Sequence, residues 1–77
     1  QLNGDNMKKY IVIKKMNQQK NQYLIGQVAE VLGRKKSRYD EDCLKVKTCD
    51  NRIILVLDNS DYHTYIAQPE KLIQLVA

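Results

Sequence analysis

Short apolar runs separated by polar clusters dominate the sequence. Residues 10–16 and 52–57 are rich in β-branched side chains. Residues 43–48 alternate, with Leu44 and Val46 on one face and Cys43, Lys45 and Lys47 on the other. Such patterns are typical of β-strands. Asp50 and Asn51 form a favourable turn pair between two of these runs, which predicts a hairpin of residues 43–48 and 52–57.

Residues 23–33 (YLIGQVAEVLG) are predicted to form another strand. Gly26 and Gly33 enclose too few residues to sustain a helix. A glycine inside a strand pattern indicates a bulge or sharp bend, which we expect at Gly26. The polar segment 17–22 (NQQKNQ) is predicted as a loop before this strand, and residues 33–42 (GRKKSRYDED) as a long loop after it.

The C-terminal part alternates again at residues 62–66 before a polar interruption. Because Pro69 cannot donate to a sheet ladder, we expect one 3₁₀ turn at residues 68–71 and a last strand at 72–76. Five or six short strands with frequent turn signals predict an all-β protein, a small antiparallel barrel. Residues 8–77 form a single domain in this interpretation, after a disordered segment 1–7 of which residues 1–6 are interpreted as a cloning extension.

Composition narrows the possible cores and sites. Hydrophobic residues make up 43% of the chain, but Phe and Trp are absent, so Ile, Leu, Val and five Tyr must fill the core. No apolar run reaches the roughly twenty residues of a membrane span, and no signal peptide is evident, so we expect a cytoplasmic protein. Cys43, Cys49 and the single histidine, His63, do not have the spacing of a zinc site. We therefore expect free thiols, no metal and no cofactor.

Positive charge is concentrated in the first half of the chain. Residues 1–38 carry a net charge of +7 and residues 39–77 a net charge of −3. The basic run followed by acids within residues 33–42 can meet a polyanion, or it can neutralise itself across a hairpin. Tyrosines between the cations offer faces on which unpaired bases stack. The candidate polyanion-binding residues are Arg34, Lys35, Lys36, Arg38, Lys14, Lys15 and Tyr39.

Residues 53–57 (IILVL) are apolar on both faces of the predicted strand. One face of a small barrel normally meets water, so Ile53, Leu55 and Leu57 are a candidate interface for a protein partner or for self-association. His63 lies between tyrosines, which is more typical of a surface strand position than of a catalytic base. No catalytic residue is therefore predicted, and the consecutive acids 40–42 are interpreted as solvated.

The order of these parts resembles the SH3-like barrels. The resemblance rests on Gly26-Gln27-Val28 in the second strand, the long loop after it, the hairpin at Asp50-Asn51 and the strand–turn–strand ending, and it covers roughly residues 8–76. Among these barrels, KOW-type domains bind RNA, although their preceding glycine and basic turn are missing here. Peptide-binding SH3 domains need an aromatic groove with a tryptophan, and this chain has none. Type II dihydrofolate reductases share Gly-Gln-Val, but residues 62–66 (YHTYI) replace their Val-Gln-Ile-Tyr active-site strand.

The sequence thus predicts a small non-catalytic binding module, a protein-interaction or regulatory domain. The alternative is KOW-like binding of RNA or single-stranded DNA through residues 34–38 and the cations between Lys8 and Lys20. An enzyme resembling the type II reductases is the third and least favoured interpretation.

Overall fold

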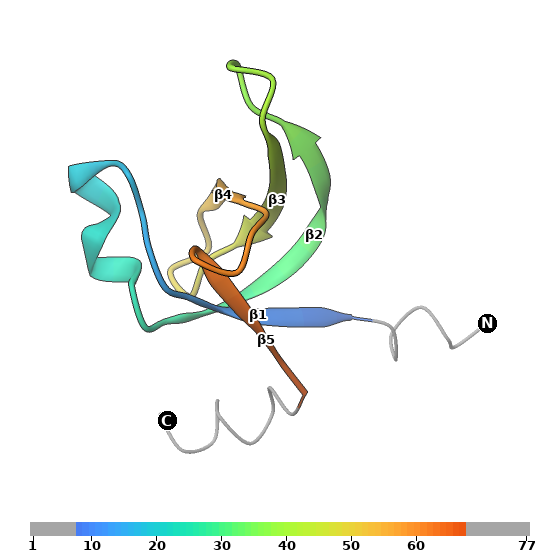
Figure 1. Ribbon diagram of the computed structural model, residues 1–77. Helices are drawn as coiled ribbons and strands as arrows, with labels where there is room; N and C mark the ends of the chain where they lie inside the picture. The colour runs from blue at the N-terminus through green and yellow to red at the C-terminus, as the bar shows by residue number, and fades with distance from the viewer. Residues whose placement is uncertain (1–7, 68–77) are drawn as a thin grey trace.

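The computed structural model describes residues 8–67, which form five β-strands and one 3₁₀-helix (Figure 1). The strands are β1 (Lys9–Ile13), β2 (Val28–Lys36), β3 (Asp42–Lys47), β4 (Ile53–Leu57) and β5 (His63–Ile66), and the helix is η1 (Gln19–Leu24). All the strand pairs are antiparallel, which confirms the predicted all-β class. The predicted 3₁₀ turn at 68–71, the strand at 72–76 and the segment 1–7 lie outside the described residues.

The strands form one sheet in the order β4-β3-β2-β1-β5. β1 is paired on both sides, whereas β4 and β5 are the two edges of the described sheet, and no hydrogen bonding between them closes a barrel. The sheet is strongly curved, with β2 bending around the molecule in Figure 1. The architecture is thus a curved open sheet in which β4 is bonded on one side.

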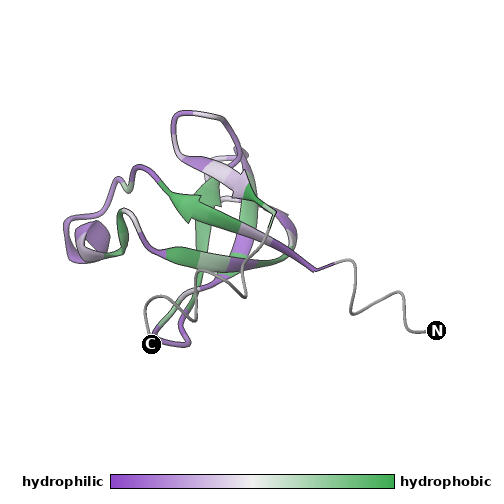
Figure 2. Ribbon diagram, turned by 90° about the horizontal axis from the view of Figure 1, so that it is seen from below, coloured by the Kyte–Doolittle hydropathy of each residue, from purple (hydrophilic) through white to green (hydrophobic). Residues whose placement is uncertain are grey.

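The core fills the concave side of this sheet. Facing positions on neighbouring strands share a face, so Ile11 opposite Ala29 and Leu44 opposite Val56 point to the same interior. Figure 2 shows the apolar strands at the centre and the hydrophilic η1 at the side. The buried core consists of Ile11, Ile13, Met16, Leu24, Ala29, Leu44, Val46 and Val56. The alternation of the β3 sequence therefore correctly predicted that Leu44 and Val46 share one face, which is the core face, while Cys43 of the other set is buried as well.

The connection between β1 and β2 differs from its predicted form. Residues 17–22 were expected as a loop and residues 23–33 as a strand, but η1 occupies part of both and β2 begins only at Val28. The side-chain amide of Gln22 donates to the main-chain oxygens of Met16 (2.6 Å) and Gln18 (3.2 Å), and these bonds support a tight helical turn. Leu24 at the end of η1 is fully buried, so one apolar side chain anchors a segment that is otherwise polar.

Gly26 produces the sharp bend predicted within residues 23–33. Its φ is +88°, and its N–H donates to the main-chain oxygen of Ile13 at 2.7 Å. An added Cβ would meet no atom within 4 Å, so only the backbone conformation requires glycine here.

Replacing Gly26 by alanine is expected to lower the free energy of unfolding by about 1–2 kcal/mol, because alanine is disfavoured at positive φ. Urea denaturation followed by circular dichroism measures this change. The matched control is Gly33→Ala, where the added Cβ also meets open space and φ is not in the left-handed region. Equal losses in the two variants would contradict the assignment.

Half of the charged segment 33–42 is strand, and it is not the long loop expected from its composition. β2 continues to Lys36, because an irregularity between Val31 and Gly33 shifts the register and pairs residues 34–36 with 42–44 of β3. Lys36 Nζ lies 2.9 Å from a carboxylate oxygen of Asp42 across this pair. The basic and acidic halves thus partly neutralise each other, and only residues 37–41 form the turn.

Candidate functional site

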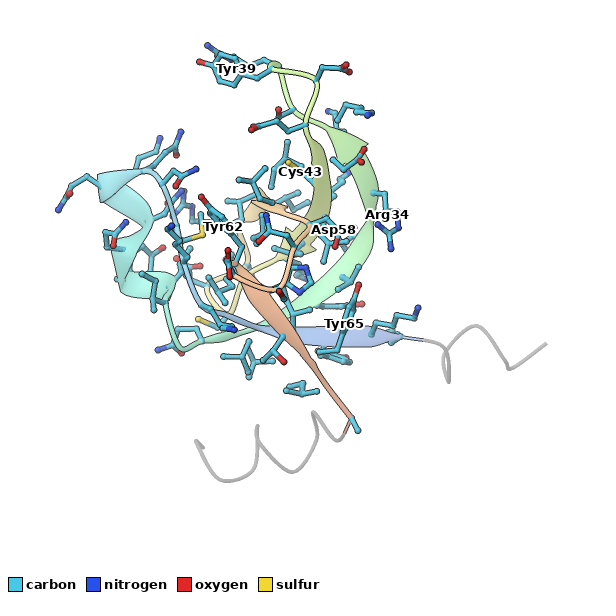
Figure 3. The ribbon with its side chains drawn as sticks, viewed as in Figure 1. Arg34, Tyr39, Cys43, Asp58, Tyr62 and Tyr65 are labelled. Atoms are coloured by element: carbon cyan, nitrogen blue, oxygen red, sulfur yellow. The ribbon has the colours of Figure 1, made fainter. Side chains whose placement is uncertain are left out.

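A groove of about 780 Å³ runs along β4. Its floor is β4, one side is the segment that leads from β1 into η1, and one end is the β2–β3 turn. In Figure 3 it lies between Tyr62, Cys43 and Tyr39. The lining residues are Lys15, Met16, Asn17, Gln18, Lys20, Asn21, Ser37, Arg38, Tyr39, Glu41, Cys43, residues 52–57 and Tyr62.

Within residues 8–67, no strand pairs with the outer edge of β4, which faces this groove. Hydrogen bonds from Thr48 N–H to the Arg52 oxygen (2.8 Å) and from Asp58 N–H to the Asp42 oxygen (3.0 Å) place even-numbered β4 positions in the hydrogen-bonded pairs with β3. Because the two kinds of pair alternate along an antiparallel ladder, the odd-numbered positions direct their N–H and C=O groups away from β3. These positions are Ile53, Leu55 and Leu57, of which the Leu57 oxygen already accepts a hydrogen bond from the Asn59 N–H at 3.0 Å.

Cations surround the groove. Its lining includes Lys15, Lys20, Arg38 and Arg52, against a single acid, Glu41, among the described residues. Lys15 Nζ lies 5.2 Å from the ring centre of Tyr62, and the Arg38 guanidinium lies 6.0 Å from that of Tyr39. These cation–π contacts hold each cation beside an aromatic face. The groove therefore combines an apolar strand edge with a positive border.

The structure separates the predicted polyanion-binding residues. Lys15, Arg38 and Tyr39 line the groove, together with all three members of the predicted interface. The others lie elsewhere: Lys14 donates to the main-chain oxygen of Ser60 at 2.7 Å, Arg34 and Lys36 form salt bridges with Asp58 and Asp42, and Lys35 lies beside them on β2. The polyanion candidates are thus not one continuous patch, but part of them joins the predicted interface.

Two lining residues, Arg52 and Tyr62, were not singled out from the sequence. Tyr62 packs against the core and its hydroxyl donates to Asn17 Oδ1 at 2.9 Å, which ties the turn before β5 to the side of the groove. Arg52 donates to the hydroxyl of Tyr23 at 2.8 Å. The sequence feature that could have indicated a role for Arg52 at the groove is its position directly before the apolar run 53–57.

Asp50 connects η1 to the β3–β4 turn beneath Arg52. Its carboxylate accepts hydrogen bonds from the hydroxyls of Thr48 and Tyr23. These bonds, that from Thr48 first, lower the pKa of Asp50 below its ordinary value. The network fixes Tyr23 at the end of η1, and hence the side of the groove, relative to β4.

His63 is buried, not at the surface position expected from its neighbours. It faces the fully buried Ile13 across the β1–β5 pair, and only 6% of it is exposed. Its Nε2 lies 3.1 Å from Asp58 Oδ1, and the other oxygen of Asp58 accepts a hydrogen bond from Arg34. Burial raises the pKa of Asp58, but the bonds from His63 and Arg34 lower it more, so the net pKa lies below its ordinary value. This cluster is outside the groove.

Neither cysteine is part of a disulfide: Cys43 is buried beside the groove and Cys49 is exposed. Burial raises the pKa of the Cys43 thiol, which keeps it in the protonated form. Within residues 8–67, no three His, Cys, Asp or Glu side chains are grouped closely enough to bind a metal ion. The same residues include no helix with the length and apolar character needed to cross a membrane.

Comparison with known proteins does not assign the chain to a family. No protein-family model, curated protein or solved structure matches the chain. Inference about function therefore depends on the geometry of the groove.

Proposed function

We propose that this chain is an SH3-like, non-catalytic protein-interaction module that binds a segment of a partner protein in the groove along β4. The antiparallel sheet in the order β4-β3-β2-β1-β5 is compatible with an SH3-like fold. One observation carries the functional proposal: the outer main-chain groups of Ile53 and Leu55 and the N–H of Leu57, which have no partner within residues 8–67, lie along a groove.

Edge strands of this kind associate with other chains unless a charge, a proline or a covering segment blocks them. Residues 53–57 contain neither a charged residue nor a proline, and 60% of Ile53 is exposed. The groove volume of about 780 Å³ is within the roughly 300–1,000 Å³ of known ligand sites. His63, the single imidazole of the chain, points to Asp58 and not into the groove, which favours binding over acid–base chemistry there.

Selection from a display library of random peptides tests the proposal. Peptides enriched on the full chain are expected to bind Ile53→Ser about tenfold more weakly, because an exposed apolar contact of the β4 edge is lost. Fluorescence anisotropy with the enriched peptides measures the affinity. The matched control is Leu32→Ser, which removes another exposed apolar side chain from a strand outside the groove. A library with no enriched peptide, or equal affinities for the two variants, would reject the groove as a protein-binding site.

Binding of single-stranded nucleic acid is the second candidate function. The pairing of Arg38 with Tyr39 and of Lys15 with Tyr62 supports it, because cations meet phosphates while aromatic faces stack on bases. An oligothymidine titration at low and high salt separates this function from the first. Salt-sensitive oligonucleotide binding without any enriched peptide would favour the nucleic-acid function.

A further inference from the structure

The free edge of β4 determines the conformation of a segment that fits the groove. Ile53 and Leu55 each direct one N–H and one C=O outward, and Leu57 directs its N–H outward while its oxygen accepts from the Asn59 N–H (3.0 Å). An extended chain can bond to such an edge as an additional strand. Building on the proposed function, we propose that the partner segment is acidic and binds as a strand beside β4.

Charge along the groove selects the composition of this segment. Arg52 directly precedes β4, and the pairing of Cys43 with Leu57 places the β2–β3 turn, which carries Arg38, at the other end. A strand bound between them has a guanidinium near each of its ends. Arginine recognises carboxylates through paired, charge-assisted hydrogen bonds, so acidic residues near the ends of the segment are favoured.

The two sides of the groove select an alternating pattern. Ile54 and Val56 point to the side of the sheet where Met16 packs, and Ile53, Leu55 and Leu57 point to the opposite side. A strand added to β4 has the same alternation. One set of its side chains therefore lies beside Ile53, Leu55 and Leu57 and fits apolar groups.

The other set of side chains faces the segment around Met16 that leads from β1 into η1. This segment carries Lys15 and Lys20 into the groove lining. Carboxylates on this side are attracted by both ammonium groups. The expected ligand is thus an extended segment in which Glu or Asp alternates with an aliphatic residue.

A second copy of the chain is a poorer occupant of the same edge. The chain carries a net charge of +4. Antiparallel pairing of two β4 strands would bring Arg38 of one copy near Arg52 of the other, because these residues lie at opposite ends of β4. Like charges placed opposite each other disfavour such pairing.

The test is a titration of the full ¹⁵N-labelled chain with a short synthetic peptide in which Glu and Val alternate. The largest amide shifts are expected at Ile53, Leu55 and Leu57, with affinity falling as salt is raised. The variants Lys15→Glu and Arg38→Glu are each expected to raise Kd about tenfold through lost charge complementarity. The matched control is Lys9→Glu, which makes the same charge change on an exposed β1 residue outside the groove.

Two altered peptides separate main-chain bonding from charge. In an added strand, every second N–H of the peptide points toward β4. Methylating these nitrogens removes the donors to β4, whereas methylating the nitrogens in between leaves these donors intact. Binding is expected to be lost in one of these peptides and retained in the other. A peptide with Gln in place of Glu is expected to bind about tenfold more weakly than the original.

Several results would overturn the proposal. Equal affinity for the Glu and Gln peptides would show that the groove does not select acidic residues. Equal binding of the two methylated peptides would show that the ligand does not bind as a strand. Groove-binding library peptides without acidic residues would contradict it while leaving the proposed function intact. Concentration-dependent shifts at β4 without any peptide would identify a second copy as the occupant, and oligothymidine binding without peptide binding would identify nucleic acid.

Discussion

Replacing Leu24 by alanine is expected to lower the free energy of unfolding by about 2–5 kcal/mol, the range found for buried leucines. Leu24 is fully buried in the core beside Met16, at the point where η1 ends. Its loss leaves a cavity and releases the one apolar anchor of a polar segment. Urea denaturation of both proteins, followed by circular dichroism, measures the difference.

The same substitution is informative about the groove. The segment that carries Lys15 and Lys20 into the groove connects to the core through Met16 and Leu24, so loosening η1 moves these cations. The control is Tyr23→Ala, which removes the adjacent side chain, itself 53% exposed, and its bond to Asp50. A smaller loss is expected there, about 0.5–1.5 kcal/mol for an exchanged hydrogen bond. A loss for Leu24→Ala no greater than that for Tyr23→Ala would contradict the role of Leu24 as the anchor.

The most local features of the fold were predictable from the sequence. The β3–β4 hairpin follows from the alternation of Leu44 and Val46 with lysines and from the turn pair Asp50-Asn51. Asn51 has the positive φ of 67° that such turns require. Gly26 was correctly expected at a bend, because a glycine inside an apolar strand pattern usually marks a point where the backbone departs from regular strand geometry.

Features that depend on partners distant in the sequence were not predictable. The sequence of η1 predicts a polar loop, because the contacts that stabilise the helix are distant in the sequence. Leu24 packs in the core, and the hydroxyl of Tyr23 donates to Asp50. The basic residues 34–36 were predicted to lie in a loop, because their strand forms only by pairing with residues 42–44.

The candidate site shows the same division. The sequence identified Ile53, Leu55 and Leu57 by their apolar character, and Arg38 and Tyr39 by the basic run. Only the three-dimensional arrangement places these two groups in one groove. Arg52 completes the positive border from a position that looks ordinary in the sequence.

Replacing Asp58 by alanine is expected to lower the free energy of unfolding by about 1–3 kcal/mol, the cost of leaving a buried polar group without its partner. His63 loses the acceptor for its Nε2, and its Nδ1 already has no hydrogen-bond partner within residues 8–67. The matched control is Asp61→Ala, which removes an exposed carboxylate with no salt bridge among the described residues. Urea denaturation at neutral pH provides both measurements, and equal losses would contradict the role of Asp58.

The pH dependence of stability distinguishes the charge of Asp58 from its shape. The pKa of this carboxyl is lower in the folded protein than in the unfolded chain, so its ionised form favours folding. The contribution is complete above the unfolded pKa, which is about 4 for an aspartate, and disappears as the pH falls through the lower folded value. The difference in free energy of unfolding between the native chain and Asp58→Asn is therefore expected to shrink between neutral pH and about pH 3. A constant difference over this range would show that shape and packing, not the ionised carboxylate, account for the effect.

The two partners of Asp58 are expected to contribute unequally. Arg34 has 70% of its side chain exposed, whereas the side chain of His63 is 5% exposed. Water screens the Arg34 ion pair, so this pair contributes little to stability. Arg34→Met should therefore destabilise the protein less than Asp58→Ala. Equal losses would instead mean that the salt bridge to β2, and not the hydrogen bond to buried His63, gives Asp58 its effect on stability.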